Sequence, residues 1–106
     1  MNQETKDKIE ELQNLEQNIN SLIGQKQQIQ AQQAEIENAI SQLEGTDKVF
    51  RIIGNIMVAS DKVKVKKELD EKKEFIDLRI KTMDKQEEKL RNKAQELQKA
   101  VMEKIK

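Results

Sequence analysis

Apolar residues recur every seven positions along residues 4–44, in two lines separated alternately by three and four residues. The two lines are Leu15, Leu22, Ile29, Ile36, Leu43 and Leu12, Ile19, Lys26, Gln33, Ile40. This alternation is typical of the core positions of a coiled coil. It predicts one long helix over residues 4–44, with Lys26 and Gln33 as the polar exceptions in its seam.

A second repeat of seven follows along residues 61–105. Its two lines are Leu69, Ile76, Met83, Leu90, Leu97 and Lys73, Ile80, Glu87, Ala94, Val101. Each repeat covers more than 40 residues, which corresponds to roughly 60 Å of helix. Gly45 stands where a C-cap glycine belongs, and Ser60 or Asp61 can cap the second helix. The sequence therefore predicts two long coiled-coil strands and not a compact bundle.

Between the two repeats the pattern changes to a short, β-branched and apolar segment. Residues 49–53 and 56–59 are largely apolar and flank the pair Gly54-Asn55. This arrangement predicts a two-stranded β-hairpin over residues 48–59 with a type II′ turn. Because such a turn makes the strands antiparallel, the two helices are expected to fold back on one another.

The charge and the seam both favour this antiparallel pairing. Residues 1–44 carry three lysines and eight acids, whereas residues 61–106 carry fifteen basic and eleven acidic residues. Opposite net charges suit two arms that lie side by side. A register that pairs Ile40 with Leu69 places Lys26 one layer from Glu87, so these two polar seam residues are expected to compensate each other.

Composition excludes several classes of function. The 106 residues include no Cys, His, Trp, Tyr or Pro, and 38% are charged. A disulfide framework, a zinc cluster and a thiol nucleophile are therefore excluded, and a base-stacking surface is missing. No phosphate-binding loop occurs, so we expect no enzyme, cofactor or metal. Lysines gather between residues 62 and 73, but acids interleave from Glu68 onward, so nucleic acid is not an expected partner.

The sequence also indicates where the protein is located and how many domains it has. No apolar run is long enough to span a membrane, and the polar N-terminal residues do not resemble a signal peptide. A cytoplasmic protein without a membrane partner is therefore the expectation. Residues 1–106 are predicted to form one mostly α-helical domain.

The central hairpin is too apolar to remain exposed. A lone two-stranded hairpin is marginal in water, and unpaired apolar edges promote aggregation. Several chains are therefore expected to pool their hairpins into a closed sheet or barrel, unless the centre is a loop packed on its own helices. The residues expected at this assembly surface are Val49, Phe50, Ile52, Ile53, Ile56, Met57, Val58, Phe75 and Leu78.

The order of elements resembles a known family, the β-class subunits of prefoldin. The hairpin string Ile53-Gly54-Asn55-Ile56-Met57-Val58 lies between two heptad helices, as in that class. The second arm is most similar to archaeal β subunits, in residues 68–72, 78–79 and 86–89, and residues 25–27 are similar too. Many β subunits have Tyr where this chain has Phe50, which puts only a hydrogen bond in doubt.

The resemblance implies an assembly and a mechanism. It implies a hetero-hexamer of two α and four β subunits, in which the hairpins build a double β-barrel and the coiled coils project as tentacles. It also implies an ATP-independent holdase, which captures non-native client proteins at the tentacle tips and transfers them to a group II chaperonin. The alternative is a structural coiled-coil adaptor or tether, and a third possibility is a prefoldin-like chain that assembles only with itself.

The tips of the arms, residues 1–15 and 94–106, contain the candidate client-binding residues. The candidates are Ile9, Leu12, Leu97, Val101, Met102 and Ile105. Ile9, Met102 and Ile105 lie outside the paired seam, whereas Leu12, Leu97 and Val101 are seam residues that become available only when the helix ends fray. Flexible Met1 and Met102 suit a promiscuous surface. The alternative is that these residues simply complete the coiled coil, and it is favoured for Leu12 and Leu97.

Overall fold

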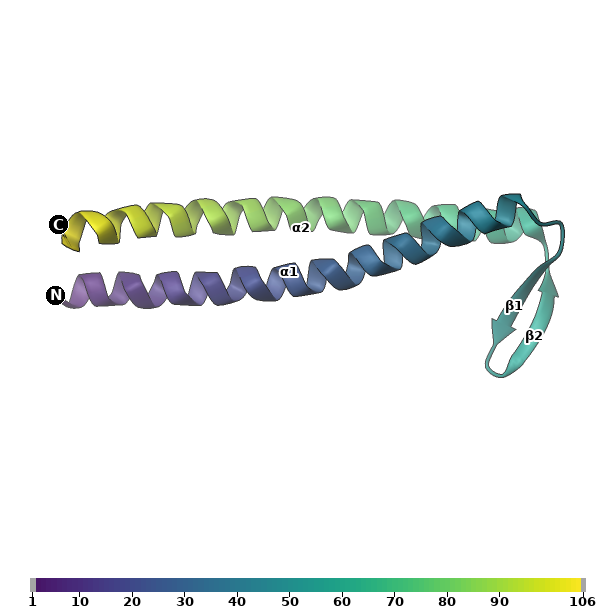
Figure 1. Cartoon of the computed structure of the whole chain (residues 1–106), viewed down its shortest axis with the longest axis horizontal. Coiled ribbons are helices and arrows are strands. Elements are labelled where there is room, and N and C mark those ends of the chain that lie inside the picture. Colours follow the sequence, from purple (N-terminus) through teal and green to yellow (C-terminus); the bar gives the residue numbers. More distant parts are fainter. Residues whose placement is uncertain (1, 106) are drawn as a thin grey trace. The chain divides into compact units, whose positions relative to one another are not determined.

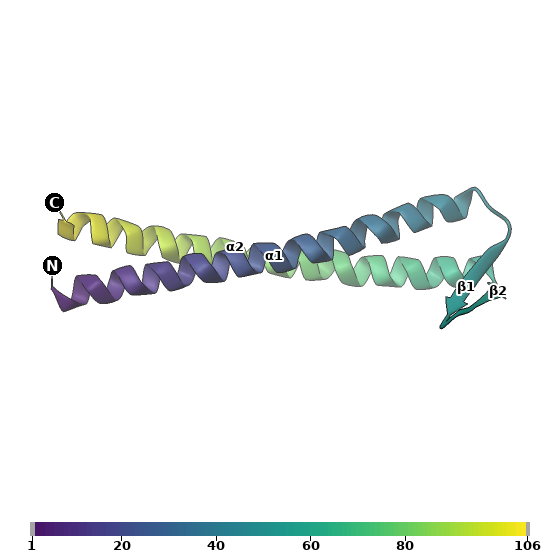
Figure 2. The ribbon, with the colours of Figure 1, turned by 60° about the horizontal axis from the view of Figure 1, so that its bottom comes forward.

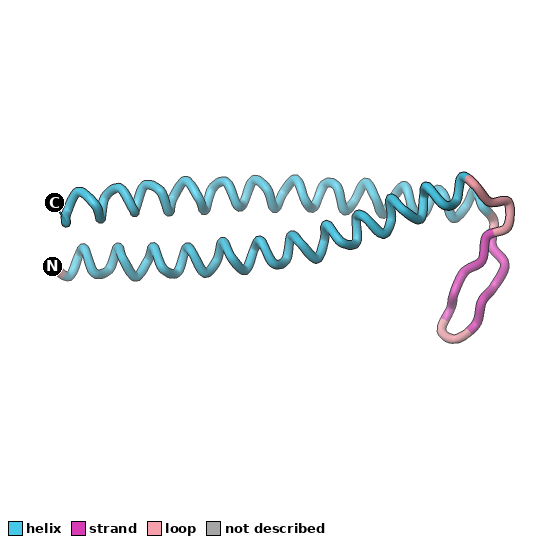
Figure 3. Tube along the Cα trace, viewed as in Figure 1, coloured by secondary structure: helices cyan, strands magenta, loops and turns pink. Residues whose placement is uncertain are grey.

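The computed structural model describes residues 2–105, which form two long helices joined by a β-hairpin (Figure 1, Figure 3). In chain order the elements are α1 (Gln3–Glu44), β1 (Val49–Ile53), β2 (Ile56–Ser60) and α2 (Lys62–Ile105). The predicted helix–hairpin–helix fold is therefore confirmed. The chain divides into two compact units. A terminal unit contains the helices up to Gln28 and from Lys81 onward, and a hairpin unit spans Ile29–Ile80.

The helix ends are set by local hydrogen bonds. Asn2 Oδ1 accepts a bond from the Thr5 amide (2.8 Å) at the start of α1. Asp61 Oδ1 accepts one from the Val63 amide (3.0 Å), so Asp61 caps α2. Gly45 directly follows α1, as predicted, although its φ is not positive and it therefore does not form a left-handed C-cap. Instead its amide donates to the carbonyl of Gln42 (3.2 Å), which tightens the last turn.

The predicted heptad lines form the seam in both units. Each of their positions is buried or half-buried, including the polar exceptions. The buried apolar residues are Leu15, Ile19, Ile29, Leu43, Ile76, Met83 and Val101. Thr5 lies one heptad before Leu12 and is also buried, so the seam begins earlier than its apolar residues indicate. The heptad assignment is therefore confirmed.

The helices run antiparallel within each unit. In the hairpin unit Gln33 Nε2 donates to Asp77 Oδ1 (2.7 Å). In the terminal unit Lys93 Nζ lies 3.6 Å from Glu11 Oε1, and both views show the start of α1 beside the end of α2 (Figure 1, Figure 2). The predicted register places Gln33 opposite Ile76, the neighbour of its observed partner, so the observed contact agrees with it to within one residue.

The hairpin has the predicted register and turn. β1 and β2 pair antiparallel from Val49 with Ser60 to Ile53 with Ile56. Gly54 has φ 61° and is the one described residue with positive φ, as a type II′ turn requires at its first central position. Side chains alternate between the faces of a strand. The Arg51 face therefore carries Val49, Arg51, Ile53, Ile56, Val58 and Ser60, and the Phe50 face carries Phe50, Ile52, Met57 and Ala59.

Gly24 lies in the interior of the continuous helix α1, and no close packing at this position requires a glycine. A Cβ atom at this position would meet nothing within 4 Å. Because glycine costs about 1 kcal/mol relative to alanine inside a helix, Gly24→Ala should raise the free energy of unfolding by about that amount. Urea unfolding followed by far-UV circular dichroism, at fixed protein concentration, measures it. Gly54→Ala is the opposite control, since positive φ makes it destabilising; an unchanged midpoint for Gly24→Ala would contradict the prediction.

Candidate functional site

The hairpin exposes most of its apolar side chains in the single chain. Six of them are between 43% and 73% exposed, namely Phe50, Ile52, Ile53, Ile56, Met57 and Val58. Val49 is half-buried, and the small side chain of Ala59 is exposed. The hairpin extends to one side of the ends of α1 and α2 that it joins, and does not pack along them (Figure 1). The structure therefore does not show the alternative of a loop packed on its own helices, and it leaves a contiguous apolar surface of the kind that marks interaction sites.

An ion pair connects the hairpin to α2. The guanidinium of Arg51 on β1 forms an ion pair with the carboxylate of Glu68 on α2. Beside it lies a groove of about 730 Å³ between α1 and α2, here called the basal groove. It is lined by Gln32, Glu35, Ile36, Arg51, Glu68, Glu71, Lys72, Phe75, Ile76 and Arg79. The sequence predicted a role for Phe75 but not this groove, because the groove depends on where the hairpin meets the helices.

Phe75 and Leu78 are the two predicted assembly residues on α2. Both lie outside the seam, and their exposed fractions are 66% and 63%. Phe75 lines the basal groove, and Leu78 is three residues further along the same helix. Both side chains therefore remain largely exposed in the single chain.

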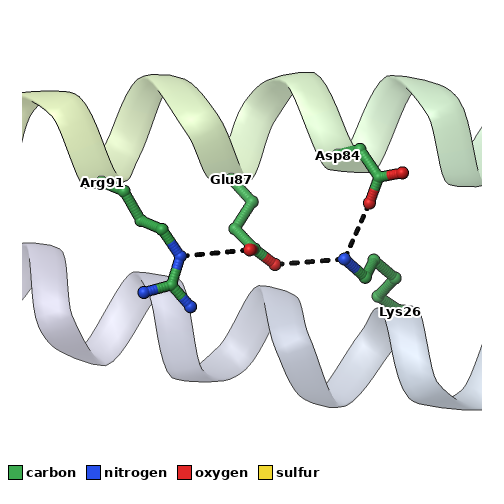
Figure 4. Close-up of polar contacts among 4 residues, drawn as sticks. All are labelled: Lys26, Asp84, Glu87 and Arg91. Carbon is green, nitrogen blue, oxygen red and sulfur yellow. Dashed lines mark hydrogen bonds and ion pairs between the residues drawn. The ribbon is translucent and has the colours of Figure 1, made fainter.

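A polar cluster replaces apolar packing in the seam of the terminal unit (Figure 4). Lys26 Nζ donates to Asp84 Oδ1 (2.7 Å) and to Glu87 Oε1 (3.3 Å), and its side chain is only 19% exposed. Glu87 also accepts a bond from Arg91 Nε (3.1 Å). The predicted pairing of Lys26 with Glu87 is confirmed, while Asp84 and Arg91 are additional partners. The bonds to Asp84 and Glu87 raise the pKa of Lys26, and those from Arg91 and Lys26 lower the pKa of Glu87.

A second polar cluster lies in the hairpin unit. Asp77 accepts bonds from Lys73 Nζ (2.8 Å) and Gln33 Nε2 (2.7 Å), and Lys73 Nζ also lies 3.8 Å from Glu37. These bonds, from Lys73 first, lower the pKa of Asp77, and the bond to Asp77 raises that of Lys73. The polar seam residues on both helices are therefore paired, and polar pairs of this kind specify register more than they add stability.

The lowered pKa values of Asp77 and Glu87 predict a loss of stability in acid. A carboxylate with a lower pKa in the folded state stabilises that state above its unfolded pKa, and the stabilisation disappears as the pH falls through the lowered folded value. The double variant Asp77→Asn/Glu87→Gln should therefore lose less thermal stability between pH 7 and pH 3. Melting followed by circular dichroism tests this. Glu74→Gln/Glu88→Gln is the matched control, and equal losses in both variants would argue against the prediction.

The tip candidates differ in how far they are exposed. Val101 is buried, and Ile9, Leu12 and Leu97 are half-buried. Met102 and Ile105 are 56% and 59% exposed, three residues apart on the last turn of α2. A pocket of about 300 Å³ beside them is lined by Asn2, Thr5, Lys104 and Ile105. Met1, which the sequence also suggested for this surface, lies outside the described residues.

Residues 2–105 contain neither a membrane-spanning helix nor a cluster of metal ligands. None of the helices there is long and apolar enough to cross a membrane. No group of three or more Asp or Glu residues in that range is arranged to hold a metal ion.

Fold and surface together define a class of proteins, antiparallel coiled coils whose two helices are joined by an exposed apolar β-hairpin. The family profile described as "Prefoldin subunit" matches residues 6–106. Prefoldin subunit beta of Archaeoglobus fulgidus is 41% identical over 93 residues, which are 85% of this chain and 80% of that protein. Its counterpart from Sulfurisphaera tokodaii is 40% identical over 95 residues, 87% of this chain and 76% of that protein.

A solved structure agrees with these sequence matches. The crystal structure of the prefoldin beta subunit from Thermococcus strain KS-1 superimposes with a TM-score of 0.91 at 27% identity, covering 96% of this chain and 92% of that one. The chain therefore belongs to the prefoldin subunit family. This membership implies a chaperone role within a prefoldin complex.

Proposed function

We propose that this chain is a β-type subunit of a hetero-hexamer of two α and four β subunits. The hexamer acts in the cytoplasm as an ATP-independent holdase, which captures unfolded proteins and transfers them to a group II chaperonin. The observation that carries the proposal is the exposed apolar hairpin between two coiled-coil helices, on a chain similar to proteins named prefoldin subunit beta. We further propose that residues 1–106 act as one prefoldin-type domain, because both helices run without interruption through the two compact units.

The exposed hairpin supports the assembly step. Both outer edges of the two-stranded sheet lack a strand partner in the described chain. Edge strands of this kind pair readily with strands of other chains. Shared sheets or barrels would therefore satisfy the edges and bury the apolar side chains at the same time.

The helix tips support the capture step. Met102 and Ile105 present adaptable apolar side chains on the last turn of α2. One such tip offers a small surface, so its affinity for a client is weak. Several tips on one complex would add their contacts, and multivalent binding increases overall affinity without requiring any new contact. This arrangement suits clients that share exposed apolar segments but no common sequence.

The decisive experiment combines the chain with a partner of the α class. Light scattering should give a single species near the mass of two α and four β chains, and this species should suppress aggregation of unrelated denatured proteins without ATP. A stable monomer or dimer that is indifferent to the α chain, with no suppression, would instead favour the structural adaptor. Transfer is tested by adding a group II chaperonin and following release of a labelled client.

A further inference from the structure

The two faces of the hairpin require different kinds of cover, if the proposed assembly of β copies is correct. The Phe50 face has only apolar side chains, whereas the Arg51 face carries an arginine paired with Glu68 of its own α2. The interior of a small closed barrel is filled by packed side chains. An arginine buried there without Glu68 would lose its partner at a large cost in free energy. The Phe50 face therefore fills the interior of a closed sheet, and the Arg51 face is directed toward the helices.

The chain's own helices cover only part of the Arg51 face. Val49 and Ser60, at the helix end of the hairpin, are half-buried. Ile53 and Ile56, a cross-strand pair beside the turn, are 61% and 66% exposed. Figure 1 shows the turn as the part of the hairpin most distant from its junction with α2. These two isoleucines, here called the hairpin tip, need cover from another chain.

The basal groove offers apolar side chains that could cover the hairpin tip. Ile36, Phe75 and Ile76 supply apolar lining, and Phe75 remains two-thirds exposed. The charged lining residues are Arg51, Lys72, Arg79, Glu35, Glu68 and Glu71, three of each sign. A groove with no net charge offers no general attraction to nucleic acid or to a strongly charged peptide. Its apolar lining residues can cover an uncharged apolar occupant, and both residues of the hairpin tip meet that description.

We propose that the basal groove binds the hairpin tip of a second copy of this chain. Both surfaces are present on every copy, and neither is covered within a single chain. Antiparallel pairing of equivalent edge strands, β1 with β1 or β2 with β2, makes two neighbouring hairpins point in opposite directions. Each tip then lies over the helix base of the other copy. The contact is reciprocal, as expected for a two-fold interface, and it joins the copies by a second contact besides the shared sheet.

Cysteine cross-linking between two copies tests this contact. The chain has no cysteine of its own, so one copy receives Ile56→Cys and a second copy of different length receives Lys72→Cys. Lys72 lines the basal groove. Asp70→Cys is the matched control, because Asp70 is an exposed residue two positions away on the same helix and does not line the groove. In the assembled complex with α chains, the Ile56–Lys72 pair should form its mixed disulfide about tenfold faster than the Ile56–Asp70 pair.

The outcomes separate this contact from the assembly itself. Adding Phe75→Ala to the Lys72→Cys copy should slow the mixed disulfide, because the apolar lining is lost. Equal rates at Lys72 and Asp70, or no mixed disulfide in a complex of full mass, would overturn the docking while leaving the proposed function intact. A cross-link from an α-chain hairpin to Lys72 instead of one from Ile56 would also overturn it. If light scattering shows no complex at all, the proposed function fails together with the docking.

Discussion

Replacing Ile52 and Met57 with lysine is expected to abolish assembly while leaving the helices folded. The two residues oppose each other on the Phe50 face and are 73% and 65% exposed in the single chain. Lysines there remain solvated before assembly, so they cost the isolated chain little. Inside a shared sheet the same ammonium groups would be buried without partners, which costs several kcal/mol. Light scattering with α chains should show only small species, and circular dichroism should show an unchanged helical signal.

Val63 provides a matched control for this variant. It is an apolar residue with 76% exposure on the first turn of α2, outside the hairpin. Val63→Lys adds a similar charge at a similar exposure and should leave the mass of the complex unchanged. If the Ile52→Lys/Met57→Lys chain still reached full mass, the hairpin would not be the surface that joins the subunits.

The architecture was predictable because its determinants are local and periodic. A repeat of seven fixes which residues of a helix form the seam, and one Gly-Asn pair between apolar strands fixes the hairpin turn. The register also followed, because pairing the two seams brought Lys26 close to Glu87. The early start of the seam at Thr5 did not follow, since a threonine carries no apolar signal even when its position is buried.

The remaining errors and omissions concern contacts that spacing does not determine. Asp84 and Arg91 lie beside the seam, and whether a long side chain reaches them depends on its direction and rotamer. The ion pair of Arg51 with Glu68 depends on the angle at which the hairpin leaves the helix, and a pattern along the chain does not encode that angle. The backbone conformation of Gly45 could not be predicted either, because a glycine at the end of a helix permits a left-handed conformation but does not require one.

The exposure of each tip candidate depends on which side of its helix it occupies, and the sequence predicted this only in part. Val101 and Met102 are neighbours in the chain, yet the first is buried in the seam and the second is exposed. Leu97 and Leu12 are half-buried seam residues, as the coiled-coil interpretation expects. Met102 and Ile105 are exposed, and Ile9 is half-buried but outside the seam, so serine can replace these three residues at limited cost to the coiled coil.

Serine at Ile9, Met102 and Ile105 is expected to weaken capture of clients without disturbing assembly. Burial of a large apolar side chain against a client contributes about 1.5–3 kcal/mol when complete, so partial loss at three positions should raise the complex concentration needed for half-suppression about tenfold. The assay is aggregation of a denatured protein, with light scattering to verify an intact complex.

Val63→Ser is the matched control, because it removes an apolar side chain that is 76% exposed, more than Met102 or Ile105, from the opposite end of α2. It should leave suppression unchanged. If the triple-serine complex suppressed aggregation as well as the unmodified complex, clients would bind elsewhere, and the apolar residues at the ends of the helices would serve only the coiled coil. If Val63→Ser impaired suppression equally, the effect would follow total apolar exposure and not the tips. Only a loss confined to the tip variant fits capture by a few adaptable side chains at the helix ends, because that mechanism depends on position as well as on hydrophobicity.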